Sequence, residues 1–148
     1  MKKYLFSLLL LLATYTVKAE YRSLSTFGAD TLRYLEYNFV ENNPYNGKTV
    51  GDFINKYELP VNGAIFIRAA KEGKTDDLLG LSVMYLYLGE TWDATQKYYV
   101  MDIYFIPPYE DVYTIKRKYG NYEGLDRLKM FKDYIIDRIE VVIMNNRK

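Results

Sequence analysis

Cysteine and histidine are both absent from this 148-residue chain. Without cysteine the protein has no disulfide bond, so a folded domain must be stabilised by packing alone. Without either residue it lacks the most common zinc ligands and both usual nucleophile–base pairs, Ser–His and Cys–His. The sequence also has no repeating Asp/Asn/Glu loop of the calcium-binding type. We therefore expect no metal and no other cofactor.

A strong charge of either sign is also lacking, because 20 Lys and Arg residues are balanced by 19 Asp and Glu residues. A near-neutral surface gives no electrostatic reason to expect nucleic acid or an anionic membrane as a partner. The one basic run, Lys116-Arg117-Lys118, is explained by the end of a helix, where cations are favoured.

The apolar run near the start of the chain, Leu5–Leu12, is far shorter than the ~20 residues that a membrane-spanning helix needs. Two lysines precede it, and Val17-Lys18-Ala19 follows it with small residues at the positions that signal peptidase reads. This layout favours a cleaved signal peptide over a membrane anchor. The sequence predicts a signal peptide over 1–19 and a single α+β domain over 20–148, periplasmic or secreted from a bacterium and not stably inserted in a membrane after cleavage.

The centre of the fold is predicted at Leu78–Leu88, eleven residues without a charge. Shorter apolar runs at 64–69 and 98–106 lie on either side, joined to it by polar connectors, which indicates a three-strand antiparallel meander. Alternate residues of a strand point to opposite faces, so the small Gly80 and Ser82 predict close approach of a helix to their face.

Helical spacing of apolar residues predicts helices at 31–41, 49–59, 110–119 and 124–133. Asp30 is the expected N-cap of the first, and Thr49 with Asp52 resembles the capping box of the second. Tyr134–Met144 fits either a helix or a strand, and its many β-branched residues favour a strand. The fold class is thus α+β, with a four-stranded, mainly antiparallel sheet (the meander plus a C-terminal strand) and helices packed on one face.

Several segments of the chain, YLEYNF, YNGKTVGDF, ELPV, the Pro-Pro pair after a strand, and IDRIEVVI, are similar in arrangement to small exported proteins of Bacteroidetes-type bacteria. No activity is assigned to that group, so the resemblance implies an exported location and carries no function.

Tyrosine is abundant, with 17 in the chain. Tyr85, Tyr87 and Tyr98 lie at the ends of two predicted neighbouring strands, with Trp92 in the polar loop between them. We expect these four residues, joined by Tyr99 and Tyr104, to form one exposed aromatic patch, because tyrosine and tryptophan suit binding surfaces. The alternative is that the tyrosines simply cover the sheet. A protein or peptide is the expected partner, with a glycan next.

Catalysis would have to come from carboxylates. Glu90 and Asp93 flank Trp92, an arrangement that suits a sugar ring beside a proton donor, whereas Asp102 is expected to face the open side of the sheet. Asn46-Gly47-Lys48-Thr49 ends like a phosphate-binding loop, but the first glycine and the preceding strand of that motif are missing. We therefore expect a non-enzymatic binding domain, and the alternative is a glycan-directed hydrolase that uses the Glu90-Trp92-Asp93 loop.

Overall fold

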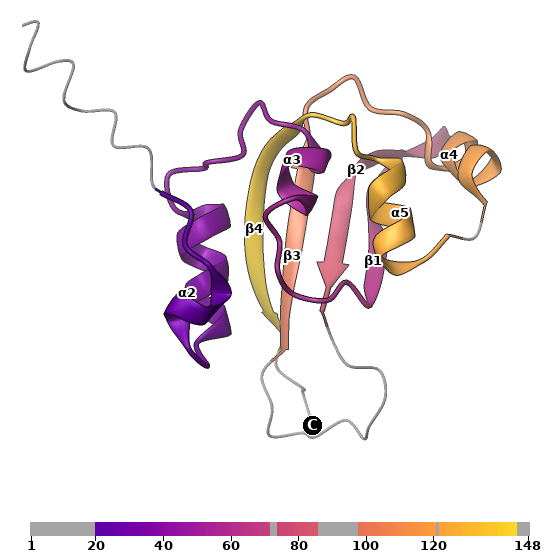
Figure 1. The fold of residues 1–148 in the computed structure, drawn as a ribbon. Coiled ribbons are helices and arrows are strands. Elements are labelled where there is room, and N and C mark those ends of the chain that lie inside the picture. Colours follow the sequence, from indigo (N-terminus) through magenta and orange to yellow (C-terminus); the bar gives the residue numbers. More distant parts are fainter. Residues whose placement is uncertain (1–19, 72–73, 86–97, 121, 145–148) are drawn as a thin grey trace, which may run out of the picture.

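The computed structural model describes residues 20–71, 74–85, 98–120 and 122–144, which form an α+β fold (Figure 1). Four antiparallel strands pair in the order β1-β2-β3-β4. Their bounds are Gly63–Lys71 for β1, Lys74–Met84 for β2, Tyr98–Phe105 for β3 and Ile136–Met144 for β4. The predicted fold class is confirmed, including the meander and the C-terminal strand.

The helices are short. They comprise η1 (Leu24–Phe27), α2 (Thr31–Leu35), η2 (Glu36–Val40), α3 (Val50–Ile54), α4 (Val112–Tyr119) and α5 (Gly124–Met130). The predicted caps are present: the Asp30 side chain accepts from the Arg33 N–H, and Thr49 and Asp52 form a reciprocal capping box. Local sequence therefore fixes where these helices begin.

The first predicted helix, 31–41, changes character in its middle, where α2 passes into the π-helical turn η2. The buried Asn38 explains the change, because its side-chain amide donates to the Tyr34 carbonyl at 3.2 Å and to the Arg22 carbonyl at 2.8 Å. A side chain that takes up the i−4 carbonyl competes with the α-helical backbone bond. The Glu41 N–H accordingly donates to the Glu36 carbonyl, an i−5 bond typical of a π-helix.

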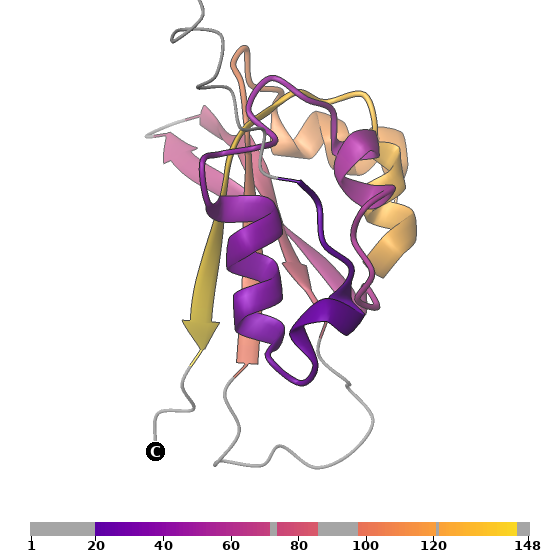
Figure 2. The same ribbon diagram turned by 60° about the vertical axis from the view of Figure 1, so that its left-hand side comes forward.

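The helices lie on one face of the sheet (Figures 1 and 2). The core between them is formed by side chains that are almost completely buried, among them Leu81, Val83, Met101, Ile103 and Ile139 from the sheet, and Tyr34, Phe39, Phe53, Ile115, Leu128 and Phe131 from the helical layer. None of the helices in the described ranges is long and apolar enough to cross a membrane.

The prediction that a helix packs against Gly80 and Ser82 is wrong. Leu81 and Val83 face the helices, so Gly80 and Ser82 point to the open side of the sheet. A register shift between Ile67 and Arg68 of β1 adds a residue to β2 and breaks the simple alternation there. Glycine is required at position 80 because of the close approach of β3. A Cβ at this position would lie 2.0 Å from the Ile103 carbonyl oxygen.

Asp102 lies on the open face, as the sequence predicts. It is half-buried, accepts a hydrogen bond from the Ser82 hydroxyl, and stands directly opposite Glu140 on β4. The open face thus carries a polar cross-strand row next to an apolar one formed by Met84, Val100 and Val142.

Candidate functional site

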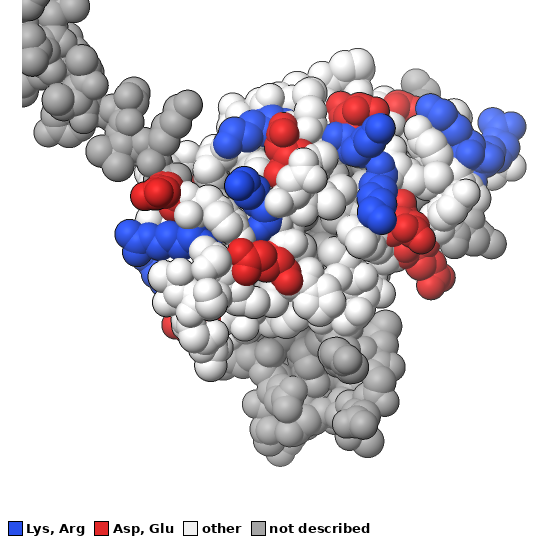
Figure 3. All heavy atoms as spheres, viewed as in Figure 1, with Lys and Arg blue, Asp and Glu red and all other residues white. Residues whose placement is uncertain are grey.

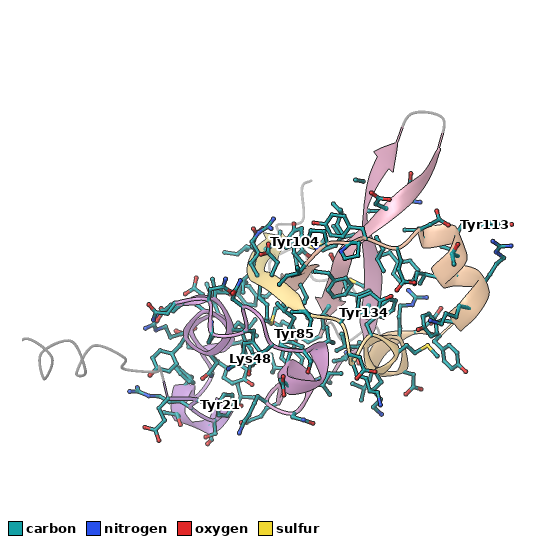
Figure 4. The ribbon with its side chains drawn as sticks, turned by 90° about the horizontal axis from the view of Figure 1, so that it is seen from above. Tyr21, Lys48, Tyr85, Tyr104, Tyr113 and Tyr134 are labelled. Carbon is teal, nitrogen blue, oxygen red and sulfur yellow. The ribbon has the colours of Figure 1, made fainter. Side chains whose placement is uncertain are left out.

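A groove runs along the outer side of β1, where this strand meets α4 and α5. Its volume is about 450 Å³, and a smaller hollow of about 240 Å³ continues it toward the β1–β2 hairpin. The lining residues are Ile65, Phe66 and Arg68 of β1, Asp76 of β2, Val112, Tyr113 and Lys116 of α4, Gly120 directly after α4, and Arg127 of α5. Figure 4 shows α4, marked by Tyr113, beside the hairpin and far from the N-terminal helices.

The α4 wall of the groove is held to the sheet by backbone contacts. The Leu78 N–H donates to the Glu110 carbonyl at 2.8 Å, and Asp77 and Asp111 form an isolated antiparallel bridge. The Asp111 side chain then caps α4 by accepting from the Thr114 N–H at 2.8 Å. The start of α4 is therefore fixed relative to β2, and its buried Val112 is directed into the space beside β1.

Strand β1 is an edge of the described sheet, because it pairs with β2 alone. The Ala64 carbonyl points outward and accepts from the Arg127 guanidinium at 2.6 Å. In an antiparallel strand the N–H and C=O of alternate residues point the same way, and the register from Ala64 to Ile67 is regular. The backbone groups of Phe66 therefore also point outward, into the groove.

The groove walls are positively charged. Arg68 forms an exposed ion pair with Asp76, whose N···O distance is 3.3 Å. Lys116 and Arg127 lie within salt-bridge distance of no carboxylate in the described part of the chain. Arg127 is instead held by the Ala64 carbonyl and by the Phe66 ring, which its Cζ approaches to 5.0 Å. Three cations thus face one carboxylate.

The basic character extends along α4. Arg117 lies over the Tyr113 ring at 4.8 Å, and Lys118 lies over the Tyr119 ring at 4.8 Å. A hydrogen bond with Tyr119 raises the pKa of the Lys118 ammonium, so this group stays charged. Figure 3 shows Lys and Arg side chains gathered at the end of the molecule where α4 lies, whereas both signs are interspersed elsewhere on this face.

The floor of the groove is apolar. It is formed by half-buried Phe66 and buried Val112 on the helical side of the sheet, whereas the 52%-exposed Ile65 borders the groove from the open face, because it pairs with Ser82. An apolar floor with cationic walls suits a ligand that carries an apolar side chain next to a carboxylate.

Of the predicted aromatic residues, Tyr85, Tyr99 and Tyr104 have side chains that the structure describes. Tyr85 stacks on Tyr99 with ring centroids 6.3 Å apart, and both rings pack against the core on the helical side. Burial raises the pKa of the Tyr85 hydroxyl to about 12. Tyr104 lies on the open face, where the Arg138 guanidinium covers its ring at 3.9 Å. The described tyrosines of these strands therefore do not share one surface.

Tyr98 is the first residue of β3, where its backbone pairs with Met144. Tyr87 and Trp92 lie outside the described residues, as do Glu90 and Asp93 of the alternative catalytic loop. The binding roles predicted for Trp92, Tyr87, Tyr98 and Tyr85 stay predictions.

Sequence reasoning missed the groove. Lys116 belongs to the basic run that was assigned to a helix end, and Arg68 is the single charge in the apolar run 64–69. Arg127 gives no signal of its own in the sequence. Only the pairing of β1 with β2 and the anchoring of α4 bring these three cations together.

Within the described ranges no three Asp or Glu side chains are grouped so that they could hold a metal ion. Comparison with protein-family models, curated proteins and solved structures finds no match to this chain. The predicted resemblance to exported Bacteroidetes-type proteins is therefore untested, and a functional assignment depends on the geometry of the surface.

Proposed function

We propose that this protein is an exported, non-enzymatic binding domain that takes an extended acidic segment of a partner protein in the groove beside β1. One observation carries the proposal: an edge strand with outward-facing backbone at Phe66 is flanked by Lys116 and Arg127, two cations without a carboxylate partner in the described structure. Addition of an extended peptide to an exposed sheet edge is a common mode of protein recognition.

The groove also defines the side chains that such a segment carries. Successive residues of an extended peptide point to opposite sides, so every second residue faces the helical side, where it contacts Phe66 and Val112. Carboxylates at other positions on this same side reach Lys116 and Arg68 at the walls. A segment that carries both an acidic residue and Val, Ile, Leu or Phe at every second position meets both conditions.

The proposed location follows from the predicted signal peptide at 1–19, which directs the mature domain, residues 20–148, to the periplasm or the exterior. Because the chain has no cysteine, the domain functions without any disulfide in that oxidising compartment. The proposed partner is a protein or peptide at the cell envelope.

The test is a selection from a random octapeptide display library on the immobilised mature domain. We expect enriched peptides to combine carboxylates with apolar residues, and their binding is then measured by fluorescence anisotropy. Lys116→Glu reverses a groove charge and should weaken binding by about tenfold or more, since a buried like-charge contact costs over 1.4 kcal/mol. Two N-methylated peptides provide a second test, one methylated at the odd and one at the even backbone nitrogens. Only one of them should lose binding, because strand pairing uses every second N–H.

The matched control is Lys118→Glu, the same charge reversal two residues further along α4 but outside the groove lining. It should change the affinity by less than about threefold, because an exposed charge acts only through screened long-range attraction. Enrichment of neutral or basic peptides, or equal loss with both variants, would contradict the proposal. Binding of a single-stranded oligonucleotide that Lys116→Glu abolishes would assign the groove to nucleic acid instead.

A further inference from the structure

A second hollow, of about 480 Å³, lies on the helical side between the N-terminal segment, η2 and α3, well away from the groove. Figure 4 marks its position with Tyr21 and Lys48. Three tyrosines form its walls: Tyr21, Tyr37 and Tyr45. We call it the tyrosine cleft.

The walls of the tyrosine cleft are rigidly held. Tyr45 is only 5% exposed and stacks on Phe39 with ring centroids 5.5 Å apart. The Tyr21 hydroxyl is hydrogen-bonded to the Glu58 carboxylate. Tyr37 packs against Phe27 at 5.6 Å. A cleft whose walls are fixed before binding loses little conformational entropy when a ligand enters.

Cations cover the ring faces. Lys48 lies 4.9 Å from the Tyr45 ring centroid and Lys56 lies 5.3 Å from the Tyr21 ring centroid. The other face of Tyr45 is taken by Phe39, so this ring offers a ligand its hydroxyl rather than a stacking surface.

The charges of the cleft balance. Four cations lie at its walls, namely Lys48, Lys56 and, over the Tyr37 ring, Arg22 and Arg33, and they are matched by the carboxylates of Glu20, Glu41, Asp52 and Glu58. The Asp52 carboxylate accepts from the N–H and the hydroxyl of Thr49, and these hydrogen bonds lower its pKa, so it stays ionised. Such a balance gives no electrostatic preference for an ionic ligand.

Uncommitted hydrogen-bonding groups are concentrated here. The hydroxyls of Tyr37 and Tyr45 and the side-chain amide of Asn55 make no hydrogen bond within the described structure. Burial raises the pKa of the Tyr45 hydroxyl to about 12, so it remains a donor at neutral pH. Hydroxyl and amide groups both donate and accept, which matches a ligand made of hydroxyl groups.

We propose that the tyrosine cleft binds a short neutral saccharide, whose hydroxyl groups pair with Tyr37, Tyr45 and Asn55 between the two lysines. This site is separate from the peptide groove and does not depend on the function proposed for it. The volume of the cleft falls within the range typical of small-ligand sites.

The test is a printed array of neutral and uronate-containing glycans probed with the mature domain, followed by saturation-transfer NMR with the best-bound saccharide. We expect neutral saccharides to bind. Tyr37→Phe and Asn55→Ala should each weaken binding about threefold to tenfold, the value of one lost hydrogen bond. The control, Tyr113→Phe, makes the same change in a 58%-exposed tyrosine of α4 and should leave the affinity unchanged.

Tyr37→Phe keeps the ring and its packing, so a loss of binding is not a loss of folding. Absence of any glycan signal, preferential binding of uronates, or equal affinity of all three variants would overturn the proposal. Displacement of the saccharide by a groove-binding peptide would also overturn it, because the two sites would then be one.

Discussion

At the scale of single residues, two tyrosine hydroxyls near the core differ in their hydrogen bonds. The Tyr34 hydroxyl accepts from the Glu58 N–H at 3.0 Å and lies 3.3 Å from the Lys56 carbonyl. The Tyr57 hydroxyl is buried and has no partner in the described structure, and burial raises its pKa. The same side chain is thus satisfied at one position and unsatisfied at the other.

Removing each hydroxyl should therefore have opposite effects. Tyr57→Phe is expected to be neutral or to stabilise the fold by up to ~1 kcal/mol, because it removes an unpaired buried polar group. Tyr34→Phe should cost ~1–2 kcal/mol, because the Glu58 N–H loses its acceptor. Urea unfolding of the two variants measures both values. A loss above ~1 kcal/mol for Tyr57→Phe would show that its hydroxyl has a partner.

At the scale of elements, the capping box of α3 links stability to pH. Hydrogen bonds from the Thr49 backbone and then from its hydroxyl lower the pKa of Asp52. A carboxyl group whose folded pKa is depressed stabilises the fold above its unfolded pKa, about 4 for Asp. This contribution is lost as the pH falls below that value and through the lowered folded pKa.

We therefore expect Asp52→Asn to flatten the loss of stability with falling pH between about pH 5 and pH 2. The control is Asp133→Asn, the same change at an exposed carboxylate that accepts no hydrogen bond in the described structure. Urea midpoints measured across this pH range compare the two slopes. Identical slopes for wild type and Asp52→Asn would mean that the capping box does not persist in solution.

The sequence predicts those helices and strands whose start or type is determined by residues close to them in the chain. Caps at Asp30 and Thr49 and the β-branched residues of β4 act within a few positions, and these predictions are confirmed. The π-turn at η2 depends on Asn38 bonding to Arg22, 16 residues away. The failure at Gly80 depends on which face of the sheet the helices cover, and this is determined by packing between distant elements. Contacts at such separations leave no periodic signal in the chain.

At the scale of the whole molecule, the fold is stabilised by a core of aromatic side chains and contains no disulfide bond, because the chain has no cysteine. Phe39 alone contacts the rings of Tyr34, Tyr45, Phe53 and Tyr57 at centroid distances of 5.2 to 5.8 Å. Aromatic pairs of this kind contribute about 0.5–1.5 kcal/mol each beyond the surface they bury. Packing is therefore the source of stability.

Neither a chelator nor a reductant should shift the thermal unfolding midpoint of the mature domain. The chain has no cysteine to reduce, and the described carboxylates form no cluster suited to a metal. Differential scanning calorimetry with and without EDTA and dithiothreitol measures this. A drop of many degrees with EDTA would reveal a bound metal that contributes to folding.

The groove and the tyrosine cleft were not predictable at this scale. Each collects side chains from three or more elements, and their meeting depends on the complete fold. The tyrosine-based binding site that the composition favours stays a prediction, because Tyr87 and Trp92 lie outside the described residues.

The outer edge of β1 is interrupted at both ends. At one end, the Arg127 guanidinium donates a hydrogen bond to the Ala64 carbonyl. At the other end, the register shift between Ile67 and Arg68 interrupts the regular strand backbone. Unprotected edges let identical chains add strand upon strand into fibrils, whereas bulges and charged side chains prevent this. The stretch left open around Phe66 is too short to template such growth. The edge of β1 can thus accept one partner segment and still resist the stacking of identical chains upon it.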